Sequence, residues 1–305
     1  MSQAAHLTAV LVLYGQSPSQ SAALSSLLDA VSRQPETAKR ISLFIYDNSP
    51  QPHPAPQGGA LEMHYIHDPE NAGLARAYNA VLARAQAEGS SWLLLLDQDT
   101  RLSEEYLKEL LDAADALQRS ADVGAIVPKL WAGKRLYSPD APFLWQIRRQ
   151  FASEHYAVKE EITGTLPRPL TAYNSGAALR VSALEKIGGF PEDFWLDFLD
   201  HAVFQQLHLH GYGVWVMRTV LQQNLSHFDL NTVPMWRHWS VLAAQTRFVL
   251  RFGHTSDRLF FRWWLLKTSR HYLVACRDGR VWRMRAMQAL RMRPMAARCP
   301  EGRRA

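Results

Sequence analysis

The sequence predicts an α/β protein with a mostly parallel sheet flanked by helices, followed by a helical region at the C-terminal end. Short and almost wholly apolar runs alternate with segments of helical spacing through the first half of the chain, as in sheets that are covered on both faces. Polar residues, several of them carboxylates, follow these runs directly. After Val233 the chain has helical patterns alone.

The composition indicates a globular protein. Of the 305 residues, 47% are apolar and 20% are charged, which is enough to bury a core and excludes a wholly disordered or fibrous chain. Cys276 and Cys299 lack metal-ligand spacing, so we expect neither a disulfide scaffold nor a cysteine zinc site. No run approaches the ~20 apolar residues of a membrane-spanning helix. The start of the chain lacks the basic segment of a secretory signal, and we expect a cytoplasmic protein.

The net charge of +6 is divided unevenly along the chain. From Arg251 onward there are 14 Lys and Arg against 3 acidic residues, a balance of +11, whereas the preceding residues have 20 basic and 25 acidic side chains, a balance of −5. The two parts are therefore expected to have different roles. We expect a domain over residues 1–233 and a basic helical region over residues 234–305.

Five strands are predicted in the first half of the chain from short apolar runs with β-forming residues. They are Leu7–Leu13, Ile41–Tyr46, Met63–His67, Trp92–Leu96 and Val123–Val127. Helices are predicted between them after Ser17-Pro18, from Asn71 to Ala87, and after Ser103-Glu104-Glu105, where a capping serine precedes acids in the first turn.

The second half begins with an irregular aromatic stretch from Pro128 to Pro169, which we expect to be a long functional loop. Further strands and helices are then predicted in the following order. They are strand Ala172–Leu179, helix Ser182–Ile187 closed by Gly188-Gly189, a helix within Phe194–His210, strands Val214–Met217 and Val220–Leu225, and helices Met235–Phe252, Asp257–Cys276 and Val281–Met292.

The sharpest functional feature is Asp97-Gln98-Asp99. Two carboxylates directly after a buried strand can hold a divalent cation that bridges a diphosphate, because ligands of such sheets bind at the carboxyl ends of the strands. A solvated turn is the alternative. The five apolar residues that precede Asp97 favour a metal and nucleotide site.

Two other strand ends carry candidates for binding a nucleotide-sugar. Asp47 could accept hydrogen bonds from a base or a ribose, or it could close the strand with an Asx turn. Asn71 and Gly73 lie at a helix start whose backbone N–H groups suit a diphosphate, with Arg76 as a possible counter-charge. A close-packed helix N-terminus is the alternative for this second segment.

Asp197 and Asp200 are candidates for the catalytic groups. If their segment is helical they lie on one face, where like charges raise the pKa of one carboxylate towards that of a general base. Anions that stabilise a helix N-terminus are the alternative. His227 could be a further metal ligand, but its spacing alone favours a surface histidine.

Taken together, the motifs in this order resemble the family 2 glycosyltransferases of the GT-A fold, and within them the bacterial rhamnosyltransferase-like branch. The resemblance covers about residues 7–230. The matching segments are Val10–Tyr14, Tyr46–Ser49, Asn71–Ala75, Leu95–Thr100, Asn174–Ala177 and Ile187–His201.

The resemblance implies an inverting transfer from a nucleotide-sugar. It implies that Asp47 contacts the base, that Asp97 contacts the ribose or the metal, and that Asp99 binds Mg²⁺ or Mn²⁺, with His227 as a further ligand. Asp200 corresponds to the base that deprotonates the acceptor hydroxyl.

The half that binds the acceptor departs from the branch. Asp197 occupies the place of an additional aspartate and Arg237 matches, but Ala202 and Gln206 stand where an acid and an arginine are usual. An Arg-Asn pair of the branch is replaced by Ala243-Ala244.

The basic region mixes arginines with bulky apolar residues, as in Leu259–Lys267. Such helices suit an anionic membrane surface, where a lipid-linked acceptor would lie, and no nucleic-acid motif accompanies the charge. An ordinary helical subdomain is the alternative.

The sequence thus predicts a metal-dependent transferase peripheral to the inner face of the plasma membrane. It would add rhamnose from a dTDP-activated donor to a saccharide of a cell-surface polysaccharide. A transferase using a UDP-sugar, or a catalytically silent nucleotide-sugar-binding subunit, are the alternatives.

Overall fold

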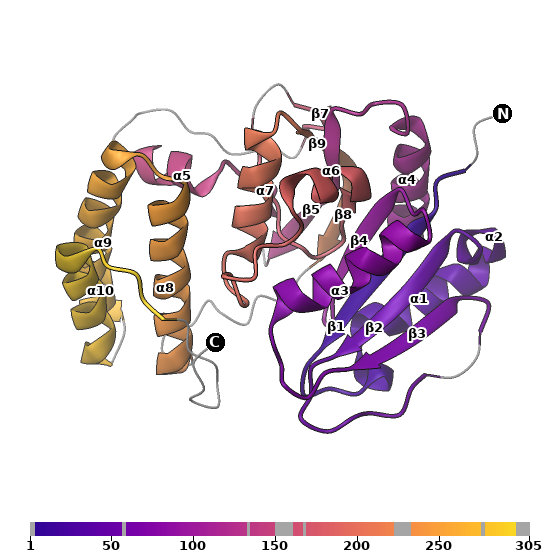
Figure 1. Cartoon of the computed structure of the whole chain (residues 1–305), viewed down its shortest axis with the longest axis horizontal. Helices are drawn as coiled ribbons and strands as arrows, with labels where there is room; N and C mark the ends of the chain where they lie inside the picture. Colours follow the sequence, from indigo (N-terminus) through magenta and orange to yellow (C-terminus); the bar gives the residue numbers. More distant parts are fainter. Residues whose placement is uncertain are drawn as a thin grey trace.

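The computed structural model describes residues 4–56, 59–132, 135–149, 161–166, 169–222, 233–275 and 278–296 (Figure 1). One sheet lies at its centre, with the strand order β3-β2-β1-β4-β8-β5-β9-β7 and with β6 paired to β5. Its strands are β1 Leu7–Leu13, β2 Ile41–Asp47, β3 Glu62–His67, β4 Trp92–Asp97, β5 Val123–Ala132, β6 Arg135–Ser138, β7 Gly164–Thr165, β8 Ala177–Arg180 and β9 Gly213–Gln222.

The predicted mostly parallel sheet is confirmed. Strands β1 to β4 run parallel to one another, β8 is antiparallel to both β4 and β5, and β9 is parallel to β5. Six of the described strands, β1 to β5 and β9, therefore run in one direction. The other three, β6, β7 and β8, run in the opposite direction. The carboxyl ends of β1 to β4 consequently meet at one edge.

Helices cover both faces of the sheet because the strand side chains alternate between two apolar cores. Leu11 of β1 belongs to the core beneath α1 (Ala22–Arg33) and α4 (Glu104–Ala116). Its neighbours Val10 and Val12 belong to the core beneath α3 (Leu74–Ala87), α6 (Val181–Ile187) and α7 (Leu199–Leu209). All seven side chains of β1 are buried, as its apolar sequence predicts.

Three local predictions are wrong. The strands predicted at Val214–Met217 and Val220–Leu225 are not separate, because β9 runs from Gly213 to Gln222. The helix expected after Ser17-Pro18 is a 3-10 turn, Pro18–Gln20, and α1 starts only after Ser21, whose hydroxyl accepts a hydrogen bond from the Leu24 amide. The stretch from Pro128 to Pro169 is not a single irregular loop. It contains the end of β5, then β6, α5 (Phe143–Arg149) and β7.

The three predicted C-terminal helices are confirmed as α8 (Met235–Phe252), α9 (Thr255–Ala275) and α10 (Gly279–Arg291). They do not have a core of their own, because Phe248 of α8 and Phe261 of α9 belong to the core that also covers the sheet. Phe143 of α5 contacts the rings of both residues edge-on, at centroid distances of 5.8 and 6.3 Å. In the described part of the chain, none of the helices is both long and apolar enough to cross a membrane.

An ion pair joins α5 to the C-terminal helices. Arg148 donates from Nε and Nη2 to the two carboxylate oxygens of Asp257, at 2.5 and 2.8 Å, and Asp257 is 1% exposed. Burial alone would raise the pKa of Asp257, but the hydrogen bonds from Arg148 and from the His254 amide lower it. The bidentate geometry therefore holds a buried carboxylate in its charged form.

Removing Arg148 tests this link. Arg148→Met leaves a buried charge without its partner and should lower the free energy of unfolding by about 1–2 kcal/mol, a range that allows for the half-exposed Arg148 side chain. Urea denaturation would measure the change. Lys39→Met is the matched control, because Lys39 pairs with Glu36 on the solvated surface and its loss should leave the midpoint unchanged. Equal midpoints for both variants would contradict the role of the ion pair.

Candidate active site

Two of the predicted functional strand ends flank the end of the central strand β1. In the parallel register Asp47 of β2 lies opposite Leu13, and Asp97 of β4 lies opposite Val12. The strand-end convergence expected from the sequence is therefore confirmed for these two carboxylates.

The Asp97-Gln98-Asp99 turn is fixed by its middle residue. The Gln98 side chain accepts a hydrogen bond from the Tyr14 amide at 3.0 Å, and the Gln98 carbonyl accepts one from the Ser21 hydroxyl at 2.9 Å. Both contacts join the end of β4 to the segment that follows β1. These two hydrogen bonds fix the turn that carries Asp97 and Asp99, in contrast to the solvated turn considered as the alternative.

A cavity of about 480 Å³ lies at this edge of the sheet. Four of the predicted site residues line it, namely Asp97, Asp99, Asp197 and Asp200. The opposite wall comes from the C-terminal helices and consists of Arg237, His238 and Val241 of α8, Tyr272 of α9, and Val281, Met284 and Arg285 of α10. The cavity is therefore closed by the basic region as well as by the sheet.

Asp97 lies deep in the cavity. Burial, together with the charges of Asp99 and Asp200, raises its pKa to about 6, although the hydrogen bond from the Ser175 hydroxyl acts in the opposite direction. Asp97 and Asp99 at the end of β4 and Asp200 in α7 line the same cavity, and a divalent cation held by the first two would offset the repulsion among the three carboxylates.

Asp200 occupies the first turn of α7. Burial raises its pKa to about 7, with a smaller contribution from the charge of Asp197. The predicted upward shift is thus confirmed, but the predicted geometry is wrong. Helix α7 begins at Leu199, so Asp197 precedes the helix instead of sharing a helical face with Asp200.

Asp197 has its own counter-charge. Arg237 of α8 lies 2.9 Å from one Asp197 oxygen, and the Ser240 hydroxyl donates to the other at 2.6 Å. A carboxylate held in this way is a poor proton acceptor. Asp197 is better described as the residue that fixes α8 against the cavity, and its catalytic role remains a prediction.

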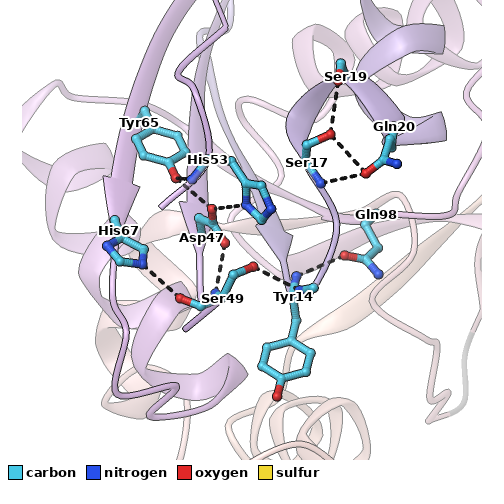
Figure 2. A network of polar contacts seen from close by, with 11 residues as sticks. Tyr14, Ser17, Ser19, Gln20, Asp47, Ser49, His53, Tyr65, His67 and Gln98 are labelled. Atoms are coloured by element: carbon cyan, nitrogen blue, oxygen red, sulfur yellow. Dashed lines mark hydrogen bonds and ion pairs between the residues drawn. The ribbon is translucent and has the colours of Figure 1, made fainter. Parts of the chain in front are cut away.

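Asp47 lies in an internal network outside the cavity lining (Figure 2). Its carboxylate is wholly buried and accepts hydrogen bonds from the Ser49 amide, the Tyr65 hydroxyl and His53 Nδ1, at 2.9, 2.6 and 2.7 Å. Burial opposes the charged form, yet these donors together lower its pKa to about 2. The Asx-turn alternative is present in the Ser49 contact, and binding to a base remains a prediction.

The segment before α3 is tightly packed. The Asn71 carbonyl accepts from the Trp195 indole at 3.0 Å, and a Cβ at Gly73 would overlap the ring and the carbonyl oxygen of Trp195. Gly73 has a φ of 99°, which favours glycine. Arg76 is exposed and lies 3.9 Å from Glu70. These three predicted nucleotide-sugar contacts are thus outside the cavity lining, and their role remains a prediction.

The described residues contain no group of three His, Cys, Asp or Glu side chains arranged to hold a metal. His227 lies outside the described residues. Of the four aspartates that line the cavity, Asp97 and Asp99 are the candidate ligands, which fits Mg²⁺, since this cation is commonly held by one or two carboxylates with substrate phosphates completing its shell.

The sequence interpretation missed Arg285 and Tyr272 as residues of the cavity wall. A signal for Arg285 was available. It stands among Val281, Met284 and Gln288 at the spacing of one helical face, where a lone cation is unusual.

The chain matches the family model described as glycosyl transferase family 2 over residues 9–188, and no curated protein matches it. Its fold is similar to the crystal structure of S. aureus TarS, with 14% identity, a TM-score of 0.51, and coverage of 90% of this chain and 44% of TarS. It is also similar to TarS 1-349 in complex with UDP-GlcNAc, with 14% identity, a TM-score of 0.54, and coverage of 94% and 82%. The chain therefore spans less than half the length of TarS. By the family match, which covers more than half of its residues, the chain belongs to glycosyl transferase family 2.

Proposed function

We propose that the chain transfers a sugar, rhamnose from a dTDP-activated donor, to a saccharide acceptor in the synthesis of a cell-surface polysaccharide. The observation that carries the transferase role is the placement of Asp97, Asp99 and Asp200 on one cavity at the carboxyl edge of the sheet. The choice of rhamnose and dTDP rests on the sequence resemblance. TarS 1-349 was crystallised with UDP-GlcNAc, which makes a UDP-sugar the second candidate donor.

In the proposed reaction Asp200 accepts the proton of the acceptor hydroxyl. The hydroxyl oxygen forms a bond to the anomeric carbon while the bond from that carbon to the diphosphate breaks. Asp97 and Asp99 would hold Mg²⁺ or Mn²⁺, which when bound neutralises charge on the leaving diphosphate. Arg237 pairs with Asp197 and fixes it, and the charge of Asp197 contributes to the raised pKa of Asp200, which favours holding the proton after transfer.

Replacing the proposed base separates an enzyme from a silent binding subunit. Asp200→Asn should keep nucleotide-sugar binding, measured by thermal shift with dTDP- and UDP-sugars with and without Mn²⁺, and should lose about 10²–10⁴-fold in transfer. Asp193→Asn is the control, because Asp193 lies outside the cavity and pairs with Arg251. Unchanged transfer in Asp200→Asn would remove Asp200 from this role.

The pH profile gives a second test. Asp200 must be ionised to accept a proton and its pKa is raised to about 7, so kcat/KM should rise with pH to a plateau, with an inflection near 7. The residual activity of Asp200→Asn should lack this inflection. An inflection near 4 in the unchanged protein would show that a carboxylate with an ordinary pKa controls the reaction.

We further propose that the C-terminal helices bind an anionic membrane surface on the cytoplasmic side. Leu259, Trp263, Leu266 and Leu273 of α9 are 40–59% exposed and recur at intervals of three, four or seven residues along the helix. Lys267 and Arg270 lie in the same segment. An exposed apolar stripe beside cations suits the boundary between lipid headgroups and acyl chains.

Point substitutions test the membrane proposal without disturbing Phe261 and Leu265, which are buried in the core. The double variant Leu259→Ser with Leu266→Ser should weaken binding to phosphatidylserine-containing vesicles about 10-fold or more, since burying each leucine contributes about 1 kcal/mol or more. Vesicle co-sedimentation would measure this loss. Leu209→Ser, at an equally exposed position on α7, should leave binding intact. Unaltered binding of the double variant would refute the proposed surface.

A further inference from the structure

Arg285 is a buried arginine in the cavity wall. It is 4% exposed, and its guanidinium lies between the rings of Trp264 and Tyr272, at 5.0 and 4.5 Å from their centroids. Nη2 donates to the Thr268 hydroxyl at 2.8 Å, whereas Nε is buried without a hydrogen-bond partner. The group is therefore held in place but incompletely bonded.

The charge of Arg285 has no fixed counter-charge in the part of the chain that the structure describes. Within the described ranges no carboxylate forms an ion pair with it, in contrast to Arg237, which pairs with Asp197, and Arg148, which pairs with Asp257. Burial of an unpaired guanidinium is costly, and two aromatic rings offset only part of that cost. Among the described residues, none supplies the anion that would complete such a site.

The position of Arg285 indicates which substrate would bring this anion. Helix α10 lies with α8 and α9 on one side of α7, and strands β1–β3 lie on the other side (Figure 1). Asp97 and Asp99, the candidates for binding the donor diphosphate, are at the end of β4, and Asp200 is in α7. Arg285 thus belongs to the group of helices that lies on the side of α7 away from β1–β3.

We propose that Arg285 binds an oxyanion of the acceptor, a phosphate or a carboxylate carried close to the attacking hydroxyl. This inference rests on the proposed function and narrows the acceptor to an anionic saccharide or a saccharide phosphate. The planar guanidinium can donate two parallel hydrogen bonds to such a group, which an ammonium cannot reproduce. Tyr272 and Met284 would provide the apolar surroundings that strengthen the contact.

Three simple probes separate the sources of the oxyanion. Methyl phosphate, methyl β-D-glucuronide and methyl β-D-glucoside are titrated calorimetrically into the full-length protein, with and without dTDP and Mg²⁺. At least one of the two anions should bind, with an affinity that dTDP leaves unchanged, and the neutral glucoside should bind at least 10-fold more weakly. The preferred anion identifies the acceptor group as a phosphate or a carboxylate.

Variants of α10 assign the binding to Arg285. Arg285→Gln should weaken anion binding at least 10-fold, and Arg285→Lys should weaken it less because the charge is retained. Arg283→Gln is the matched control, since it removes the same charge from an exposed position outside this cavity. Circular dichroism checks that each variant is folded. If Arg285→Gln does not fold, the anion affinities of Arg285→Lys and Arg283→Gln are compared instead, and weaker binding by Arg285→Lys alone supports the proposal.

Three outcomes would overturn the proposal. They are equal anion binding by the unchanged protein and Arg285→Gln, displacement of the anion by dTDP, and equal affinity for the neutral glucoside. The test is independent of donor binding. A protein that binds methyl phosphate through Arg285 but binds no nucleotide-sugar would refute the proposed function and leave the oxyanion site standing, although its assignment to an acceptor would be lost.

Discussion

The main constraint on the site is the repulsion between several carboxylates that lie at one edge of the sheet. Burial makes this repulsion strong. The chain handles each of them differently. Asp47 is charged because three donors surround it, and Asp197 is charged because Arg237 contacts it. Asp97 and Asp200 form no ion pair with a cation of the described residues, and their pKa values rise to about 6 and 7. The protein thus stabilises the charge of Asp47 and Asp197 with its own side chains and backbone. The charge of Asp97 and Asp200 depends on what enters the cavity.

This division explains why the C-terminal helices belong to the site and are more than an appendage. Arg237 and Ser240 of α8 hold Asp197, and Asp197 in turn contributes to the raised pKa of Asp200. The apolar core is continuous across residue 233, through Phe143 and Phe248. The boundary predicted at residue 233 marks a change in the sequence pattern. The apolar core and the cavity wall nevertheless include residues from both sides of it.

Patterns that depend on neighbouring residues were predictable, and contacts between distant segments were not. The apolar runs located β1, β2 and β4, and helix α8 has the expected bounds, Met235–Phe252. The Asp97 turn was recognisable because a strand end is a local feature. Of the three donors around Asp47, the Ser49 amide is local, but Tyr65 reaches it only through the pairing of β2 with β3. The ion pair of Asp197 with Arg237 spans 40 residues and likewise has no local signal.

In the basic region, the location of each charged side chain in the structure matters more than the net charge. Arg283 and Arg285 are two residues apart and contribute equally to the local balance of +11, yet one is exposed and the other is 4% exposed in the cavity wall. A solvated arginine is attracted to any anionic surface and is screened by salt, whereas a buried one selects a group that can match its geometry. The same excess of charge is therefore divided within one helix. Arg283 is accessible to solvent and to any surface that approaches it, whereas Arg285 is accessible only to a group that fits the cavity.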